Sequence, residues 1–171
     1  MRAFATFAAI LFAPTLAAGL TITEGPPIGD YGDDFASRTV LPANTDLVFG
    51  AVTLVVFGTD IIVDNDYFAL TDLLPGATFT LTVEKLENHP VNFTVLDGLA
   101  GVLIPTFTLP GEQGAVPPTV VFGTVPLSGE IVMQVKGNAP YVIGIAALRV
   151  PEPGAAALLA LGFGALLRGR R

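Results

Sequence analysis

The sequence ATFTLTV at residues 77–83 alternates apolar and threonine side chains over most of its length. Phe79, Leu81 and Val83 fall on one side of an extended chain, and the threonines fall on the other. A helix would scatter these apolar positions around its axis. The period of two therefore predicts a strand with one buried and one exposed face.

The same alternation recurs at residues 131–136 and 141–147. Short runs rich in Val, Ile, Thr and Phe, bounded by turn residues, fill most of the chain between these stretches. No helical period appears ahead of residue 150. We therefore predict an all-β fold, a jelly-roll-like antiparallel β-sandwich of eight or nine strands. Its other strands are expected at residues 47–57, broken or bent at Gly50, and at 67–70, 91–96, 102–109 and 120–122.

The N-terminus has the three parts of a secretory signal. Met1-Arg2 supplies a basic start, residues 3–16 are an apolar core, and Ala17-Ala18-Gly19 offers small residues to a signal peptidase. A buried N-terminal helix is the alternative interpretation. We therefore predict a signal helix ahead of the sandwich and an exported protein.

The C-terminus is apolar again, after an extended hinge at residues 150–153. Residues 154–167 contain only Gly, Ala, Leu and Phe, and Arg168, Arg170 and Arg171 follow them. Fourteen helical residues reach roughly 21 Å, so spanning a core of about 30 Å requires local bilayer thinning and snorkelling arginines. We predict a C-terminal transmembrane helix with the arginines on the cytoplasmic side. A helix packed in a globular core is the alternative.

Pro151-Glu152-Pro153, then an apolar helix and a basic end, resembles the PEP-CTERM sorting signal of exported bacterial proteins. The resemblance implies that an exosortase recognises and cleaves near this motif. It also implies anchoring in the inner membrane facing the periplasm, then transfer to the cell surface or the extracellular space. An association with exopolysaccharide and biofilm comes from the family alone.

The chain thus divides into four parts. They are a signal peptide at 1–19, an acidic Gly/Pro-rich lead at 20–38, the β-sandwich at 39–149 and the sorting and anchor segment at 150–171. Four of the eight basic residues and one of the fifteen acidic ones lie outside residues 20–149, so fourteen acids and four bases leave this body at −10. Such a charge repels phosphates and anionic lipid, which argues against nucleic acid as a partner. The absence of cysteine excludes disulfides and thiol chemistry.

A second resemblance covers about residues 30–149. DNDYFAL at 64–70, Pro75-Gly76 leading into the strand at 79–83, and the later runs at 91–98, 129–135 and 141–148 are similar in order to bacterial pre-peptidase C-terminal domains. That similarity implies a jelly-roll-like accessory or binding module, not a catalyst. Some members of that family bind calcium, carbohydrate or collagen.

Two acidic clusters carry the oxygens that calcium prefers. Neither has the spacing of an EF-hand, and turn formation and solubility are the alternative explanation. We expect no other cofactor. The candidate calcium ligands are Asp30, Asp33, Asp34, Asp64 and Asp66.

Little in the sequence favours an enzyme. His89 is the single histidine, and neither Ser37 nor Ser128 lies in a G-x-S-x-G elbow. A pair of carboxylates for glycoside hydrolysis would have to come from Glu84, Glu87, Glu112 and Glu130. No Gly-rich phosphate loop precedes a helix.

Three hypotheses about the exported body therefore remain open. A binding module would recognise a polysaccharide or a surface partner through exposed strand or loop residues. A structural protein would self-associate through uncapped strand edges. A secreted hydrolase would bring two carboxylates, or Ser and His89, within hydrogen-bond reach.

Overall fold

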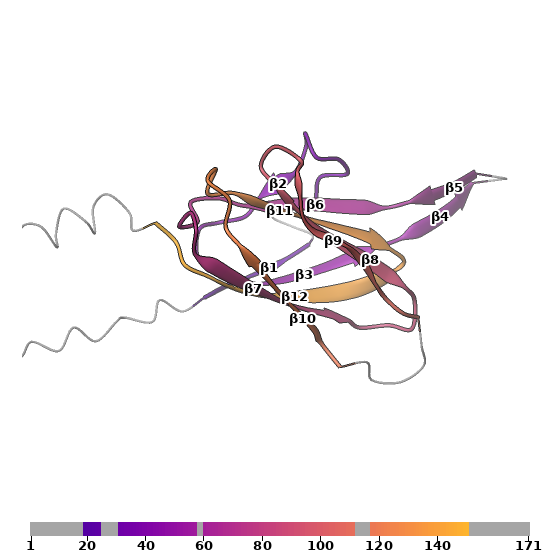
Figure 1. Cartoon of the computed structure of the whole chain (residues 1–171). Coiled ribbons are helices and arrows are strands. Elements are labelled where there is room, and N and C mark those ends of the chain that lie inside the picture. The colour runs from indigo at the N-terminus through magenta and orange to yellow at the C-terminus, as the bar shows by residue number, and fades with distance from the viewer. Residues whose placement is uncertain (1–18, 25–30, 58–59, 112–116, 151–171) are drawn as a thin grey trace, which may run out of the picture.

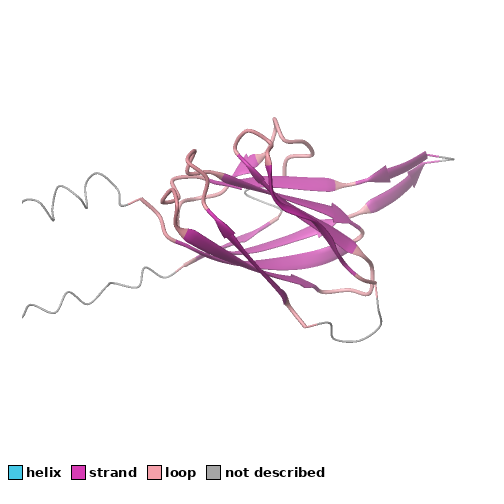
Figure 2. Ribbon diagram, viewed as in Figure 1, coloured by secondary structure: helices cyan, strands magenta, loops and turns pink. Residues whose placement is uncertain are grey.

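The computed structural model describes residues 19–24, 31–57, 60–111 and 117–150. These residues form strands, turns and loops and contain no helix, which confirms the all-β prediction for the described part of the chain (Figure 2). The predicted signal helix, the transmembrane helix and the sorting motif lie outside the described residues. The residues that are described contain no helix with the length and hydrophobicity needed to cross a membrane.

Two five-stranded sheets face each other (Figure 1). The first has the order β1 (Leu20–Thr23), β3 (Thr45–Val52), β12 (Ala139–Ala147), β7 (Thr78–Lys85) and β10 (Thr119–Thr124). The second has the order β2 (Thr39–Val40), β6 (Asn65–Leu70), β11 (Ile131–Gly137), β8 (Val91–Asp97) and β9 (Val102–Leu109). A two-stranded ribbon, β4 (Leu54–Phe57) and β5 (Asp60–Val63), projects from one end.

The sandwich is confirmed, but its strand count and strand directions differ from the prediction. Ten strands form the two sheets instead of eight or nine, and two edge pairs, β1 with β3 and β2 with β6, are parallel. The extra strands are mostly short edge or ribbon strands, too short to give a clear alternation in the sequence.

The alternation at residues 77–83 holds in β7. Phe79, Leu81 and Val83 are fully buried between the sheets, and the threonines point outward. The inward positions of β8, β11 and β12 complete the core from both sheets. Burial of each such side chain contributes about 1.5–3 kcal/mol, so the apolar period specifies which face of each strand turns inward.

The chain passes between the sheets through the ribbon, and the predicted break in the strand at 47–57 lies at Thr53, not at Gly50. Asp64 holds this crossing, because its backbone N–H donates to Thr53 O (2.9 Å) and its carboxylate accepts from Thr53 N–H (3.2 Å). Gly50 has another role. A Cβ there would overlap the hydroxyl of Tyr141, so glycine is needed for close packing and not for a bend.

Part of the segment assigned to an acidic lead belongs to the sandwich. β1 pairs with β3, and Tyr31 is almost fully buried. The Tyr31 hydroxyl donates to Phe49 O (3.0 Å), and its ring lies 5.3 Å from that of Phe68. The domain therefore begins at least as early as Leu20.

Both ends of the described body meet at the same end of the sandwich. Leu20 N–H donates to Asn44 O (2.8 Å), and Arg149 Nη2 donates to the neighbouring Thr45 O (3.4 Å). From there the eight residues of β3 run roughly 25 Å to the root of the ribbon. The two ends of the described body, at Gly19 and Val150, and the ribbon thus lie at opposite ends of the sandwich (Figure 1).

Candidate functional site

The outer surface of the second sheet carries an ordered set of polar side chains. Alternation along β6, β8 and β11 turns every second residue away from the core. Six of these outward positions, two on each strand, carry amides, hydroxyls or an amine. The set continues onto β9. We call it the polar face, and it consists of Asn65, Tyr67, Asn92, Thr94, Thr106, Thr108, Gln134 and Lys136.

Strand register arranges the polar face in two parallel rows. In the first row, Tyr67 is opposite Gln134, which is opposite Thr94. Gln134 Nε2 donates to the Tyr67 hydroxyl (2.6 Å), and the hydroxyls of Thr94 and Thr106 lie 2.8 Å apart. Within this row, side-chain hydrogen bonds therefore link β6 with β11 and β8 with β9.

The second row runs beside the first. Lys136 is opposite both Asn65 and Asn92, and Asn92 is opposite Thr108. The Thr108 hydroxyl donates to Asn92 Oδ1 (2.7 Å). Four strands spaced about 4.8 Å apart make each row roughly 14 Å wide. On one side the polar face ends at an apolar row of Ala69, Val132, Leu96 and Val102.

The electrostatics of the polar face are close to neutral. None of its eight members is a carboxylate, although the chain has fifteen acidic residues. Lys136 is its single charge. Partial burial, and then the nearby charge of Asp34, raise the pKa of the Tyr67 phenol. Tyr67 is therefore a neutral hydrogen-bonding group at physiological pH.

The chemistry of these groups favours ligands rich in hydroxyls. Amides and hydroxyls each provide donors and acceptors, which sugar hydroxyls can satisfy in either direction. Lys136, Thr106 and Thr108 are exposed, and Tyr67, Asn92 and Gln134 are half-buried, so they are accessible and partly held in place. Among the eight side chains of the polar face, no nucleophile is paired with a base.

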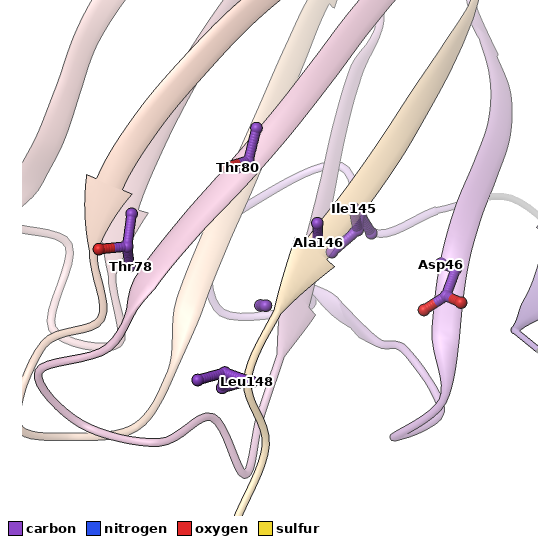
Figure 3. A pocket seen from close by; sticks show the side chains of 7 residues that line it. Asp46, Thr78, Thr80, Ile145, Ala146 and Leu148 are labelled. Carbon is purple, nitrogen blue, oxygen red and sulfur yellow. The ribbon is translucent and has the colours of Figure 1, made fainter. Parts of the chain in front are cut away.

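The outer surface of the first sheet is different. Toward one edge it carries Thr78, Thr80 and Thr82 on β7, and the exposed Val120 and Phe122 on the edge strand β10. Within the described residues, these threonines make no side-chain hydrogen bond to one another or to neighbouring side chains. At one end, an open depression of about 540 Å³ lies beside Asp46, Thr78, Thr80, Ala146 and Leu148 (Figure 3). A single carboxylate among apolar groups and threonines offers no catalytic pair.

The interior holds an acidic group that sequence analysis assigned to calcium. Asp66 is fully buried, and its Oδ2 accepts a hydrogen bond from the Tyr141 hydroxyl (2.6 Å). Burial, together with the Asp66 charge and this hydrogen bond, raises the pKa of Tyr141 well above its ordinary value. Burial and the charges of Glu24 and Asp66 also raise the pKa of Tyr31. Asp66 thus has a place in the core of the sandwich.

The other predicted calcium ligands that the structure describes, Asp33, Asp34 and Asp64, do not form one cluster. Asp34 Oδ1 accepts from the backbone N–H groups of Ala36 and Ser37, both at 2.8 Å, and these bonds lower the pKa of Asp34. Asp64 lies at the root of the ribbon. Asp33 is exposed, and Asp30 is outside the described residues. Among residues that are described, no group of three or more His, Cys, Asp or Glu side chains is placed to hold a metal ion.

The two serines considered for catalysis form their hydrogen bonds within their own loops. Ser37 bonds with Asp34, and Ser128 bonds with the backbone of Glu130. Glu130 in turn forms an ion pair with Arg38 at 2.9 Å. Within the described ranges, no hydrogen bond joins His89 to either serine. Glu112 lies outside the described residues, as do the sorting-motif residues and the C-terminal arginines.

Sequence reasoning missed the polar face. A signal for it exists in polar pairs two residues apart, Asn92 and Thr94, and Gln134 and Lys136, within two predicted strands. The pair Asn65 and Tyr67 is only half inside the strand predicted at 67–70, and the structure extends that strand to Asn65. Each pair alone only indicates an exposed strand face. The pairs become one surface because β6, β11 and β8 are neighbours in the sheet, and that order is not readable from the pattern.

Comparison with known proteins gives no sequence match and only remote structural similarities. No family model and no curated protein sequence matches the chain. Solved structures give remote similarities. One is the enzymatically active domain of bacteriophage CBA120 tailspike protein 4, at 12% identity and a TM-score of 0.34, covering 61% of this chain. Another is an Aeromonas hydrophila periplasmic inhibitor of g-type lysozyme, at 16% identity and a TM-score of 0.37, covering 75% of this chain. The chain spans 19% of the tailspike structure and 100% of the inhibitor.

Proposed function

We propose that this protein is an exported, non-catalytic β-sandwich module of the bacterial cell envelope that binds polysaccharide through its polar face. The N-terminal signal directs it across the inner membrane, where signal peptidase processes it. The PEP-CTERM-like segment, with Pro151, Glu152 and Pro153, then holds it facing the periplasm until an exosortase sorts it to the surface or the extracellular matrix.

The composition of the polar face carries this proposal. The face consists of amides, hydroxyls and one amine, with no carboxylate, on a body whose net charge is −10. Thr94 is buried, and the other seven side chains reach the surface. A surface evolved only for solubility in so acidic a protein would be expected to include acids. The three side-chain hydrogen bonds within the rows hold the groups in fixed positions, which reduces the entropy lost when a ligand binds.

The position of the two ends of the described body supports display. The described body begins at Gly19 and ends at Val150, at the end of the sandwich opposite the ribbon. A membrane segment following Val150 would tether the body at that end. The polar face runs along the side of the sandwich and would stay open to an extended polymer.

Affinity electrophoresis with named polymers tests the binding. The full-length protein in nonionic detergent should be retarded in gels that contain a neutral polymer, with xylan, β-glucan, galactomannan and dextran as the panel. The double variant Asn92→Ala/Gln134→Ala should weaken the retardation at least tenfold. The matched variant Thr80→Ala/Thr82→Ala, on the other outer face, should leave it unchanged. Mobility unaffected by all four polymers, or equal losses in the two variants, would contradict the proposal.

Sorting is tested separately. In a host that contains an exosortase, the wild-type chain should appear as a shortened form outside the inner membrane. Replacing Pro151, Glu152 and Pro153 together by alanine should leave the longer form in the inner-membrane fraction. Identical processing of the two chains would refute the sorting assignment and leave the binding result unaffected.

A further inference from the structure

Edge strands differ in how well they are protected against pairing with another chain. In the described structure the two sheets have four edges, formed by β1, β2, β9 and β10. β1 has four residues and β2 has two, so both offer short templates. β9 contains Pro105 and pairs irregularly with β8, and both features disfavour a further partner strand.

β10 has none of these protections. Its six residues, TVVFGT, contain no proline and no charge. It pairs with β7 on one side, and no described residue forms backbone hydrogen bonds to its other side. Val120 is 47% exposed and Phe122 is 67% exposed, so the edge also displays apolar side chains. An uncharged, β-prone edge of this kind favours addition of another strand.

The sequence of β10 is complementary to itself. Val120 and Phe122 point to the outer face, and Val121 points toward the core beside Leu81. Two antiparallel copies centred on Val121 would place Val120 of each copy opposite Phe122 of the other. Both pairs then lie on the outer face, and aromatic–β-branched pairs of this kind stabilise antiparallel sheets.

We propose that the protein self-associates as a twofold-symmetric dimer through antiparallel pairing of β10 with β10 of a second copy. The first sheets of the two copies join into one continuous sheet of ten strands. The polar faces belong to the second sheets, so both remain accessible. A dimer therefore presents two ligand surfaces, and a multivalent polymer would be held more tightly than by one copy.

The absence of cysteine allows a clean cross-linking test. One full-length chain carries Val120→Cys and a second, with a different tag, carries Phe122→Cys. The two chains are produced together in the same membranes and oxidised mildly. The register predicts a mixed disulfide-linked dimer in greater yield than either variant gives alone, because directly opposite residues are closer than diagonal ones. A mixed yield no higher than that of the single variants would overturn the predicted register.

Sedimentation of the full-length protein in detergent tests the contact itself. Wild type should sediment with the mass of two protomers, and Val120→Lys/Phe122→Lys should sediment as one. Leu99 and Leu127 are 87% and 93% exposed and lie in loops, so Leu99→Lys/Leu127→Lys is a matched control that should stay dimeric. A monomeric wild type, or a control that also dissociates, would overturn the proposal. A unimodal thermal melt of each variant verifies that it is folded. Val120→Lys/Phe122→Lys should still be retarded by the polymer, although less than wild type because only one polar face per particle remains, and this retention separates the result from the proposed function.

Discussion

The two outer faces of the sandwich are built from the same strand period but differ in chemistry. On the second sheet, outward side chains bond to one another across strands, as Gln134 does with Tyr67 and Thr108 does with Asn92. On the first sheet, threonines and exposed apolar residues stand side by side without such bonds. Alternation specifies only that a face is outward, and cross-strand neighbours decide whether it recognises a ligand or another protein surface.

The largest difference in stability between an inward and an outward substitution is expected within the first sheet. Phe79 on β7 is fully buried, and Phe122 on the neighbouring β10 is mostly exposed. Phe79→Ala should lower the free energy of unfolding by about 3–5 kcal/mol, because it leaves a cavity in the core. Phe122→Ala should change the stability of the protomer by less than about 1 kcal/mol. Urea unfolding of the two variants measures the difference, and equal losses would contradict the assignment of faces.

Alkaline pH should destabilise the fold mainly through the two tyrosines of the interior. The pKa values of Tyr31 and Tyr141 are raised in the fold, so both phenols keep their protons at pH values where an unfolded tyrosine ionises. Their contribution is intact below about pH 10 and is lost as pH rises above it, at roughly 1.4 kcal/mol per pH unit for each fully neutral phenol. Denaturant midpoints between pH 9 and 11.5 measure this slope. Tyr141→Phe should flatten it, and a midpoint constant over that range would refute the expectation.

A smaller effect is expected from the first row of the polar face. Tyr67→Phe removes the acceptor of the Gln134 amide and should cost about 1 kcal/mol of stability. The freed amide remains half-exposed and can bond to water, which limits the loss. Thermal unfolding measures the change, with Thr80→Val on the other face as the matched control. If Thr80→Val lost more stability than Tyr67→Phe, the hydrogen bonds of the polar face would not distinguish it from the outer face of the first sheet.

The single charge on the polar face should matter least for binding. If the ligand is a neutral polymer, Lys136→Gln should change the affinity less than about threefold, and added salt should leave it nearly constant. Affinity electrophoresis at 20 and 300 mM salt, with alginate as the acidic comparison polymer, measures both effects. Preferential binding of alginate, lost in high salt, would show that the face recognises anionic sugars instead.

Calcium is expected to leave the thermal stability of the protein unchanged. Asp34 and Asp64 bond to backbone near their own loops, and Asp66 is enclosed with Tyr141 in the core. Thermal unfolding with excess calcium and with chelator should therefore coincide. A higher melting temperature in calcium, reversed by Asp33→Asn, would restore the calcium hypothesis and place the site at the loop that includes Asp33.

The amino-acid sequence by itself determined the class of fold and the inward face of its main strands. Apolar residues two apart, as at Phe79, Leu81 and Val83, can be buried together only on one side of a strand, so this information is local. Composition alone also predicts export, since an apolar run with basic flanks needs no tertiary context to be recognised as a signal. Export stays a prediction, because the terminal segments lie outside the described residues.

Tertiary structure alone decided what the polar and acidic residues do. Asp64 and Asp66 are two residues apart, yet one closes the root of the ribbon and the other lies in the core beside a tyrosine 75 positions away. The polar face exists because strands distant in the sequence are neighbours in one sheet, and β10 is open because no described strand covers it. Those placements depend on strand order, which the short periods along the chain do not encode.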